Sequence, residues 1–373
     1  MRVVLDAGVM EAPFTGIAKV TLALHEACRQ LQPEWEVEAL HRRPLTEPLP
    51  PWMGSTQPGL AWVANPVWRR TVLPAAIARR VPDVVHFPWN GKIPPILPRC
   101  LVVTTLHDVL PLIIPGHFRS EAAEQAYSRK VQADILRTDL LITDSEYSKQ
   151  QIIHNFRVRS DPVVIYPAVS ATFIAPVTQP AAEGDYLLCV GGYNSPRKRL
   201  EPVIRVFCQL RREGRLSCRL MMTGTRRYYS ETFRQLVADG VAMGAIEERG
   251  YVTDEVLAGL MRASIALVYP SQYEGFGLPP LEAMSVGCPV ITSHYTSIPE
   301  ICGDAVLYVE PDDDADIARC LLRLANDHEL QDELRSRGKL RAQRFSWTAS
   351  AGRLLTQVEE LLGQRRRDRP GAT

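Results

Sequence analysis

The feature that most constrains the fold is a regular alternation of short, continuous apolar runs with longer amphipathic stretches along nearly the whole chain. Continuous apolar runs are typical of strands buried on both faces, and the amphipathic stretches have the period of helices. This alternation favours parallel sheets covered by helices on both faces. The expected strands lie at 2–7, 83–87, 101–109, 140–145, 163–167, 186–192, 218–224, 246–252, 265–270, 289–293 and 305–310.

The alternation is too long for one doubly wound sheet, and 373 residues are enough for two domains with separate cores. The segment 170–185 is rich in Pro, Ala and Thr and has no periodicity, so we interpret it as an interdomain segment. We therefore expect an α/β protein with two Rossmann-like doubly wound domains facing each other across a cleft. The domains would be 1–172 and 185–354 with a linker at 173–184, and a C-terminal helix at about 355–373 would pack back on the first domain.

Composition and charge exclude several classes of protein. A net charge of +1 argues against a nucleic-acid binder that relies on bulk charge. The eight cysteines are scattered singly with no CxxC pair, which favours reduced thiols of a cytoplasmic protein over disulfides or a zinc site. The first apolar run is short and interrupted by Asp6, unlike a signal peptide, and no stretch approaches the roughly 20 apolar residues of a transmembrane helix. We expect a cytoplasmic protein.

Polar residues follow several of the expected strands, where ligands bind in open parallel sheets. Gly16 lies at the start of an expected helix, where backbone N–H groups favour phosphate, although an ordinary loop explains it equally well. His107 and Asp108 end another strand. This pair is either a hydrogen-bonded core histidine with its neighbour or a polar group on the cleft that binds a sugar hydroxyl.

A run of three cations, Arg197, Lys198 and Arg199, follows a turn at Gly191-Gly192 and is expected to open a helix. Cations are unfavourable at a helix N-terminus, so this placement predicts a bound anion, with a diphosphate as the candidate. A solvated basic cluster is the alternative. The anion does not sit on a P-loop, because no GxxxxGK[ST] motif occurs.

The stretch YEGFGLPPLEAM, residues 273–284, carries two carboxylates around a glycine turn and a double proline. Glu274 lies in the turn, and Gly275 and Gly277 allow a ligand to approach the backbone closely. The prolines suit the start of a helix, and we expect Glu282 in its first turn. Ionised carboxylates only accept hydrogen bonds, so each can bind the two hydroxyls of a diol, as in a sugar or a ribose.

These residues resemble the Glu–seven residues–Glu signature of the retaining glycosyltransferases of family 4, which have the GT-B fold. The resemblance covers nearly the whole chain, and the motifs occur in the family's order. They are TGIAKV, TLHDVLP, DLLITDSEYSK, VIYPAV, GGYNSPRKRL, GYVTDEVLAGLM, YEGFGLPPLEAM, SIPEICGDAVLYVEP and RFSW. Within the family, the chain is most similar to bacterial enzymes that build surface polysaccharides by transferring mannose, rhamnose or related sugars.

The resemblance implies roles for individual residues. Glu274 would contact hydroxyls of the donor sugar, and Glu282 would bind the ribose of the nucleotide. Lys198 would neutralise the donor diphosphate, over which the loop of Gly16 would close. His107 would reach the transferred sugar and the reaction centre. Together with Glu274 and Lys198, it forms the implied catalytic set.

Further donor-binding positions also follow from the resemblance. The backbone around Val252 would meet the base, and the amides of Gly277 and Leu278 would face the phosphates. Gly275 and Phe276 belong to the same donor-binding turn. Many members of the family have an arginine where this chain has Gly192, and Arg197 is the candidate to supply the missing cation.

The implied mechanism is front-face transfer with retention of the anomeric configuration. The departing nucleoside diphosphate needs charge stabilisation, which Lys198, Arg197 and backbone amides can provide. The two glutamates are assigned to opposite ends of the donor, so neither is expected to act as the nucleophile that retaining glycosidases use. We expect no metal, because the acidic run at 312–316 belongs to a late loop and not to the phosphate region.

The favoured function is transfer of mannose or rhamnose from a GDP-sugar to a surface polysaccharide or a lipopolysaccharide O-antigen. Two alternatives stay open: transfer to a soluble metabolite from a UDP- or ADP-sugar, and non-catalytic binding of a sugar nucleotide. The expected partners are the nucleotide sugar and a glycan or lipid-linked glycan, without a cofactor or nucleic acid. Trp52, Trp62, Trp68 and Trp89 are either packing residues or candidates to stack on sugars. Arg69-Arg70 and Arg79-Arg80 are either a solvated basic surface or candidates to attract the inner membrane.

Overall fold

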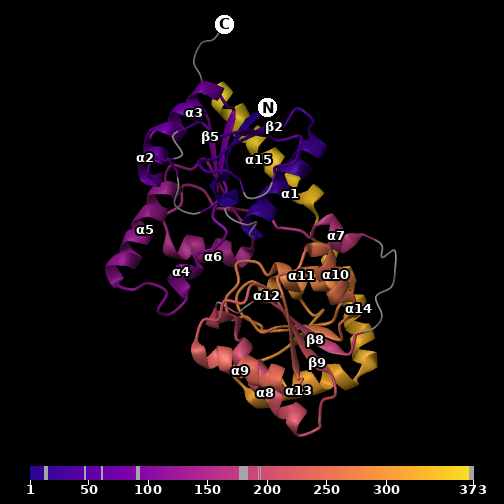
Figure 1. Ribbon diagram of the computed structural model, residues 1–373. Helices are drawn as coiled ribbons and strands as arrows, with labels where there is room; N and C mark the ends of the chain where they lie inside the picture. Colours follow the sequence, from indigo (N-terminus) through magenta and orange to yellow (C-terminus); the bar gives the residue numbers. More distant parts are fainter. Residues whose placement is uncertain are drawn as a thin grey trace. The chain divides into compact units, whose positions relative to one another are not determined.

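The computed structural model divides into two compact units (Figure 1). It describes residues 1–11, 16–45, 48–59, 62–89, 93–175, 184–191, 193 and 195–368. Unit 1 comprises Met1–Pro167 and Ser346–Thr373, and unit 2 comprises Ala168–Phe345. The first crossing between the units therefore precedes the expected linker, of which residues 176–183 lie outside the described part of the chain.

The sheet described in unit 1 has seven parallel strands in the order β3-β2-β1-β4-β5-β6-β7. The strands are β1 (Arg2–Asp6), β2 (Glu36–Leu40), β3 (Gly54–Thr56), β4 (Val84–Phe87), β5 (Leu101–Thr105), β6 (Leu140–Thr143) and β7 (Val163–Val164). Every residue of β4, β5 and β6 is buried, which explains their continuous apolar sequences. The sequence analysis missed β2 and β3, because β2 alternates polar and apolar residues and β3 is only Gly-Ser-Thr.

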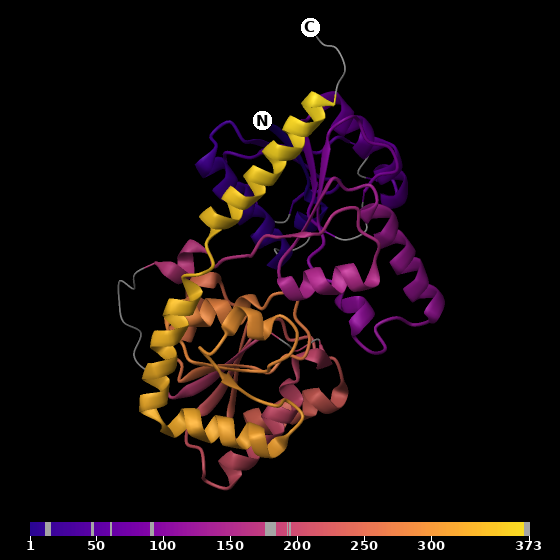
Figure 2. The same cartoon turned by 180° about the vertical axis from the view of Figure 1, so that it is seen from behind.

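Helices cover both faces of this sheet. They are η1 (Ala7–Met10), α1 (Gly16–Leu31), α2 (Asn65–Arg70), α3 (Val72–Arg80), α4 (Leu110–Ile113), α5 (Glu121–Ile135), α6 (Glu146–Asn155) and α15 (Trp347–Arg367). On one face, α1 and α15 pack together, and Leu24, Leu354 and Val358 share a core with β1. Figure 2 shows α15, in yellow, lying across this face. The helix begins at Trp347, after its N-cap Ser346, and therefore earlier than expected.

The sheet described in unit 2 has six parallel strands in the order β10-β9-β8-β11-β12-β13. The strands are β8 (Tyr186–Val190), β9 (Arg219–Thr223), β10 (Ile246–Gly250), β11 (Ala266–Tyr269), β12 (Val290–Thr292) and β13 (Leu307–Tyr308). The helices are α7 (Ala171–Ile174), η2 (Pro196–Lys198), α8 (Leu200–Arg212), α9 (Glu231–Ala242), α10 (Asp254–Ala263), α11 (Leu278–Val286), α12 (Ile298–Cys302), α13 (Asp314–Asn326) and α14 (His328–Ala342). The prediction of two Rossmann-like parallel sheets is confirmed.

Each sheet contains a point where the strand order reverses. In unit 2 the chain moves from β8 to β9 on one side and later returns to β11 on the other side of β8. The loops that follow two such neighbouring strands separate and leave a crevice at the carboxyl edge of the sheet. In unit 1 the equivalent point lies between β1 and β4. These two edges are where the fold predicts ligand sites.

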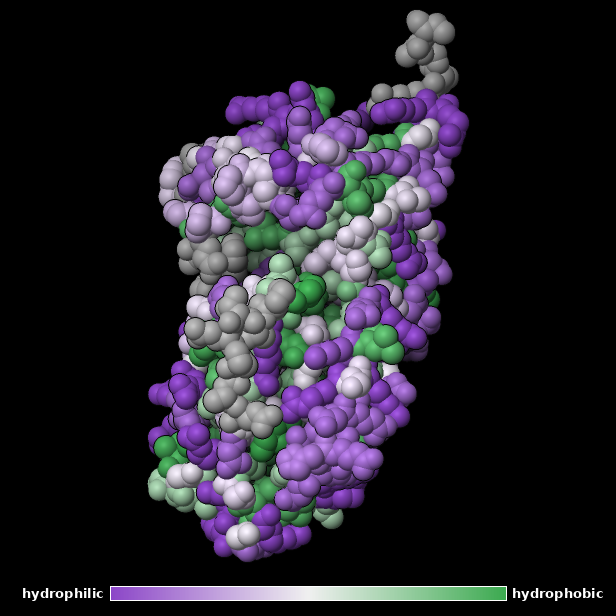
Figure 3. Space-filling view, turned by 90° about the vertical axis from the view of Figure 1, so that its right-hand side faces the viewer, coloured by the Kyte–Doolittle hydropathy of each residue, from purple (hydrophilic) through white to green (hydrophobic). Residues whose placement is uncertain are grey.

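The face of the molecule drawn in Figure 3 is mostly polar. On the face seen in Figure 3, hydrophilic side chains predominate and hydrophobic ones are scattered among them, as is usual for a globular protein. None of the described helices combines the length and the apolarity needed to cross a bilayer. The eight cysteines are buried free thiols.

Candidate active site

The candidate site of unit 2 lies at the reversal of strand order between β8 and β11. The turn η2 follows β8, and the turn at 270–277 joins β11 to α11. Because β8 and β11 are neighbours in the sheet, these two segments meet at its carboxyl edge. They carry Lys198 and Glu274, respectively.

Glu274 is the centre of this site. Its side chain is buried, and its Oε1 atom accepts hydrogen bonds from Lys198 Nζ at 2.5 Å, Arg197 Nη1 at 3.0 Å and the Tyr269 hydroxyl at 2.9 Å. Burial alone would raise the pKa of Glu274, but the positive charges of Lys198 and Arg197 outweigh burial and lower that pKa to about 2. The carboxylate is therefore ionised across the physiological pH range.

Tyr269, the last residue of β11, links Lys198 to Glu274. Burial, followed by the negative charge of Glu274, raises the pKa of Tyr269 well above its usual value, so its hydroxyl keeps its proton and donates to Glu274. The same hydroxyl accepts from Lys198 Nζ, which lies 4.2 Å from the centroid of the tyrosine ring. The sequence analysis missed Tyr269. Its position as the last residue of a buried strand was the available signal.

The three cations do not open a helix, which corrects one expectation. Pro196–Lys198 form a short 3₁₀ turn, Arg199 has a left-handed backbone with φ 50°, and α8 begins only at Leu200. The three cations thus directly precede the helix, with Arg199 as its N-cap, and none of them lies in its first turn. In this structure their anionic partners are protein carboxylates: Glu274 for Arg197 and Lys198, and Asp312 for Arg199.

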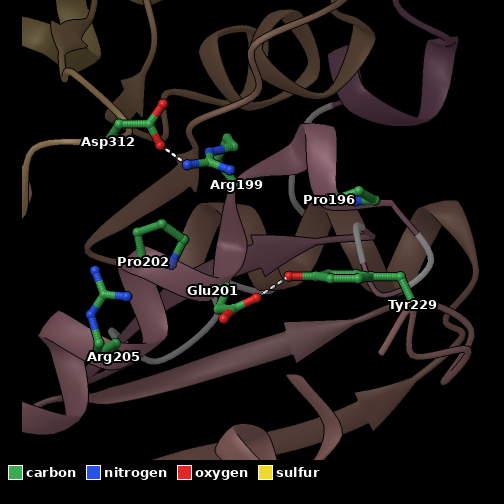
Figure 4. A pocket seen from close by; sticks show the side chains of 7 residues that line it. All are labelled: Pro196, Arg199, Glu201, Pro202, Arg205, Tyr229 and Asp312. Atoms are coloured by element: carbon green, nitrogen blue, oxygen red, sulfur yellow. Dashed lines mark hydrogen bonds and ion pairs between the residues drawn. The ribbon is translucent and has the colours of Figure 1, made fainter. Parts of the chain in front are cut away.

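Figure 4 shows the pocket beside this run, with a volume of about 220 Å³. Arg199 points across it to Asp312, and the hydroxyl of Tyr229 donates to Glu201 in the first turn of α8. The other lining residues are Pro196, Pro202 and Arg205. The third cation is thus paired with Asp312, whereas Lys198 and Arg197 are paired with Glu274.

The acidic run at 312–316 starts a helix and binds arginines. Asp313 caps α13 by accepting from Ala315 N at 2.9 Å, and Asp314 pairs with Arg205 at 2.6 Å. Among the described residues, we find no group of three or more His, Cys, Asp or Glu side chains placed to hold a metal ion.

The turn that contains Glu274 is held in place by hydrogen bonds with the loop before α12. Glu274 N donates to Thr296 Oγ1 at 3.1 Å, and the hydroxyl of Ser297 donates to the carbonyl oxygens of Glu274 and Phe276 at 2.9 Å each. Gly277 has φ +104° and forms the N-cap of α11, where a Cβ atom would lie 2.7 Å from Ile298 Cδ1. Only glycine fits this position without strain.

Glu282 lies in the second turn of α11, not in the first as expected. The helix begins at Leu278 directly after the Gly277 cap, so only residues before Glu282 form its first turn. The Glu282 side chain is half-buried, and its negative charge contributes to the raised pKa of Tyr269. The structure therefore places Glu282 within electrostatic reach of the cluster around Glu274.

The other positions assigned to the donor site lie around this cluster or at neighbouring strand ends. Val252 is half-buried between β10 and α10, and Phe276 is buried against Phe345 at a ring-centroid distance of 5.8 Å. Gly275 and Leu278 are half-buried in the turn and at the first position of α11. Gly192 lies outside the described residues.

In unit 1, Gly16 is the exposed first residue of α1, and residues 12–15 before it lie outside the described part of the chain. His107 is buried just beyond β5, with Nδ1 2.7 Å from Asp144 Oδ2 and Nε2 2.9 Å from the carbonyl oxygen of Pro88. Burial is the largest single influence on His107 and opposes its protonation, but the charge and hydrogen bond of Asp144, with smaller contributions from Pro88 and Asp108, together outweigh burial and raise the pKa of His107. Both ring nitrogens are thus engaged by protein groups, and the sequence analysis missed Asp144.

Comparisons with known proteins identify the family of the chain. Residues 15–173 match the family model described as Glycosyltransferase Family 4, and residues 184–327 match the one described as Glycosyl transferases group 1. The O-antigen chain mannosyltransferase B of Escherichia coli is 34% identical over 275 residues, which cover 71% of each protein. The serotype-specific mannosyltransferase WbdA of Escherichia coli is 27% identical over 74% of this chain, which spans only 36% of WbdA.

The solved structures that resemble the chain share its fold. Sucrose-phosphate synthase from Thermosynechococcus elongatus has a TM-score of 0.75 at 20% identity, with 97% of this chain and 99% of that one covered. WaaG, a glycosyltransferase involved in lipopolysaccharide biosynthesis, has a TM-score of 0.72 at 15% identity, with 96% and 99% covered. At these identities the likeness shows the fold alone.

Proposed function

The chain belongs to glycosyltransferase family 4 and has the GT-B fold, and from this membership we propose that it transfers mannose, or the related rhamnose, from a GDP-sugar to a growing O-antigen or similar surface polysaccharide. Mannose is the favoured donor sugar because the relatives at 34% and 27% identity are both named as mannosyltransferases. The observation that carries the proposal is the ionised Glu274 with its two cations at the strand reversal of unit 2.

In this proposal, Glu274 accepts hydrogen bonds from hydroxyls of the donor sugar and Glu282 binds the ribose. The amides of Gly277 and Leu278 face the diphosphate, and the backbone at Val252 meets the base. The half-buried position of Glu282 near Tyr269 supports its role, because a ribose diol needs a carboxylate that a ligand can reach.

Lys198 and Arg197 would stabilise the leaving diphosphate. A protonated amine has three N–H donors, and the contacts described for Lys198 engage its amine with Glu274 and Tyr269. One N–H group of the Lys198 amine therefore remains to donate to a phosphate oxygen. Glu274 holds both cations in place before the donor arrives, so charge stabilisation needs little rearrangement during the reaction.

We propose metal-independent, front-face transfer. The bond between the anomeric carbon and the phosphate oxygen breaks, and the leaving phosphate takes the proton of the attacking hydroxyl. The acceptor oxygen then bonds to the same face of the sugar, so the configuration is retained. Gly16 and His107 of unit 1 are assigned to the same reaction.

The acceptor is proposed to be a glycan or lipid-linked glycan at the cytoplasmic face of the inner membrane. Trp62 supports an aromatic contact because 84% of its surface is exposed, whereas Trp68 is buried in the core. Arg69 is ion-paired with the buried Asp6 at 2.5 Å and is therefore a poor membrane contact.

The residues around a hollow of about 590 Å³ in unit 1 are better candidates to contact the membrane. Arg2, Arg29, Arg79 and Arg80 line it together with Trp35 and Trp52. Glu36 and Glu38 also line it, and Glu38 pairs with Arg80 at 2.6 Å. The excess of arginine over glutamate suits an anionic lipid surface.

The test is a thermal-shift series with GDP, UDP, dTDP and ADP, followed by transfer assays with the matching sugar nucleotide. A ligand at one hundred times its Kd should stabilise the folded protein by about 2.7 kcal/mol. We expect GDP alone to raise Tm, and we expect Glu282→Ala to abolish the shift. Glu333→Ala is the control, because Glu333 pairs with Arg337 on the surface of α14, away from the proposed site.

A shift with UDP or ADP instead of GDP would reject the proposed donor. A shift without transfer to any glycan would favour non-catalytic sugar-nucleotide binding. If none of the four nucleotides raises Tm, the assigned donor site is wrong.

A further inference from the structure

Unit 1 contains a buried chain of hydrogen bonds whose direction is determined by its first member. The indole Nε1–H of Trp35 can only donate, and it lies 3.2 Å from His25 Nδ1, which must therefore be unprotonated. The proton of His25 is then on Nε2 and is donated to His86 Nδ1 at 2.9 Å. By the same reasoning, His86 Nε2 donates to the hydroxyl of Thr105 at 2.8 Å. Both histidines are neutral.

The burial of these two rings agrees with neutrality. His25 and His86 are 1% and 2% exposed, and burial lowers the pKa of His25 to about 4. Burial also lowers the pKa of His86, and the neighbouring His25 and His107 lower it further. The chain of hydrogen bonds ends at Thr105, the last residue of β5, two positions before His107.

His107, unlike His25 and His86, carries a proton on both ring nitrogens. The carbonyl oxygen of Pro88 can only accept, so the Nε2 atom of His107 carries a proton. The Asp144 carboxylate oxygen at 2.7 Å also accepts, so Nδ1 carries one as well. A ring with protons on both nitrogens is an imidazolium. Three histidines within one buried region thus divide into two neutral rings and one charged ring.

The titratable groups that act on His107 come from three places in unit 1. Asp144 follows β6, Asp108 is adjacent in the chain, and the neutral His86 lies on β4. A small cavity brings this region together, with Thr21 of α1, Thr105 and Asp144 among its lining residues. The negative groups in this set favour the charged form of His107, and Asp144 is the one that bonds to the ring.

We propose that Asp144 is a positioning residue that holds His107 as a fixed imidazolium at the carboxyl edge of the unit 1 sheet, and that this positive charge supports sugar transfer. The inference rests on the proposed function, because its catalytic consequence requires a reaction that develops negative charge. A leaving diphosphate develops such charge. Asp144 acts through His107 and is not itself placed on the donor.

The sign of the expected pH dependence follows from the surroundings. With Asp144 present, His107 stays charged above the pH at which an ordinary histidine loses its proton. Without Asp144, burial remains and disfavours the charged ring. Asp144→Asn should therefore move the loss of the imidazolium to lower pH. The stabilisation that the charged pair gives the fold is complete below about pH 6.5, the ordinary histidine pKa, and is lost as pH rises through the higher value of the folded protein.

The experiment compares wild type, Asp144→Asn and the control Asp139→Asn. Asp139 is a neighbouring carboxylate of the same unit, but it bonds to Val102 N and Arg365 and not to His107. Two readouts are needed: the ¹⁵N signals of the His107 ring between pH 5.5 and 9.5 without donor, and kcat and KM for GDP-mannose over the same range.

In wild type we expect ¹⁵N signals of an imidazolium at pH 7. We expect Asp144→Asn to show a neutral ring at that pH, to lose at least tenfold in kcat at pH 8, and to recover part of the loss at pH 5.5. Asp139→Asn should keep the wild-type pH profile even if it lowers Tm. A rate loss in Asp144→Asn that is uniform across pH would overturn the proposal, because a purely structural role gives that result.

The two proposals fail in different ways. A neutral His107 ring in wild type at pH 7 would overturn the inference whatever the enzyme transfers. An imidazolium in a protein that uses no GDP-sugar would instead reject the proposed function and the catalytic part of the inference, while the assignment of Asp144 as the partner of His107 would stand.

Discussion

At the scale of single residues, the site of unit 2 depends on one oxygen atom. Oε1 of Glu274 is the shared acceptor of Lys198, Arg197 and Tyr269, and the two cationic side chains are only 16% and 27% exposed. If the negative charge is removed, two poorly solvated cations remain close together. Removing one partner of a buried ion pair destabilises a protein strongly, because the other charge stays buried without compensation.

Glu274→Gln should therefore lower the free energy of unfolding by about 3 kcal/mol and reduce sugar transfer strongly. Urea unfolding followed by circular dichroism measures the first effect, and initial rates with GDP-mannose measure the second. Glu333→Gln is the matched control, because its pair with Arg337 is about half exposed and should contribute less than about 1 kcal/mol. Equal effects of the two variants would contradict the central position of Glu274.

His25 makes unit 1 sensitive to acid. Its pKa is about 4 in the folded protein because of burial, and an unfolded histidine has about 6.5. The unfolded chain therefore binds a proton first, and stability falls as pH decreases from about 6.5 toward 4. The expected loss between pH 7 and pH 4 from this residue is about 3 kcal/mol.

The measurement is urea unfolding at several pH values, followed by tryptophan fluorescence. His25→Gln should lessen the pH dependence, because a glutamine can accept from Trp35 and donate to His86 without titrating, while the part that comes from the buried His86 remains. His154→Gln changes an exposed histidine of α6 and should leave the dependence as in wild type. A His25→Gln variant with the wild-type slope would show that other groups cause the acid sensitivity.

The sequence identified Glu274, Lys198 and Arg197 as site residues, and the structure brings these three into contact. Polar residues at the ends of buried strands are visible in a sequence, which is why these were found. Tyr269 was missed because a tyrosine that ends an apolar strand has the sequence of core packing. Asp144 was missed because its partner His107 lies on another strand, and strand adjacency is a property of the folded sheet.

At the scale of elements, α11 and its cap determine where the backbone of the motif runs. Gly277→Ala would place a Cβ atom 2.7 Å from Ile298 Cδ1 in a residue with φ +104°. We expect a loss of about 2 kcal/mol in stability, together with weaker binding of the nucleotide, because the amides after the turn would shift. Differential scanning fluorimetry with and without GDP measures both effects.

Gly259→Ala in α10 is the control for that substitution. A Cβ atom there meets no neighbour within 4 Å, and alanine is the better helix former by about 1 kcal/mol. The control should therefore be neutral or slightly stabilising. If both variants lowered Tm alike, the special geometry of Gly277 would not be the cause.

The elements themselves were predictable to different degrees. Strands such as β5 and β11 are buried on both faces and have continuous apolar sequences, so they were found. The edge strand β3 and its neighbour β2 lack that pattern and were not. The start of α8 was placed too early because Arg199 adopts a left-handed conformation, which its sequence does not indicate. The central strands could therefore be predicted from local sequence better than the turns that carry the charged residues.

At the scale of the whole molecule, the tryptophans are confined to one unit. All six, at positions 35, 52, 62, 68, 89 and 347, belong to unit 1, whereas Glu274, Glu282 and Lys198 belong to unit 2. Tryptophan fluorescence therefore reports the unfolding of unit 1 alone, and circular dichroism reports both units.

We expect GDP to raise the unfolding temperature recorded by circular dichroism more than the one recorded by tryptophan fluorescence. The physical reason is that ligand binding stabilises the part of the protein that holds the ligand. Glu282→Ala should remove the difference. Equal shifts in both signals would contradict the expectation and show that the two units unfold in one cooperative transition.

The chain leaves unit 1 after Pro167 and returns to it at Ser346, which matters for how the protein is made. A ribosome releases residues in order, so the whole of unit 2 emerges before α15. Until then, Leu24 and its neighbours on α1 lack the side chains of Leu354 and Val358 that complete their core. During synthesis, the unit that starts first is thus the last to finish, and its apolar face stays open to chaperones and to aggregation until α15 has been made.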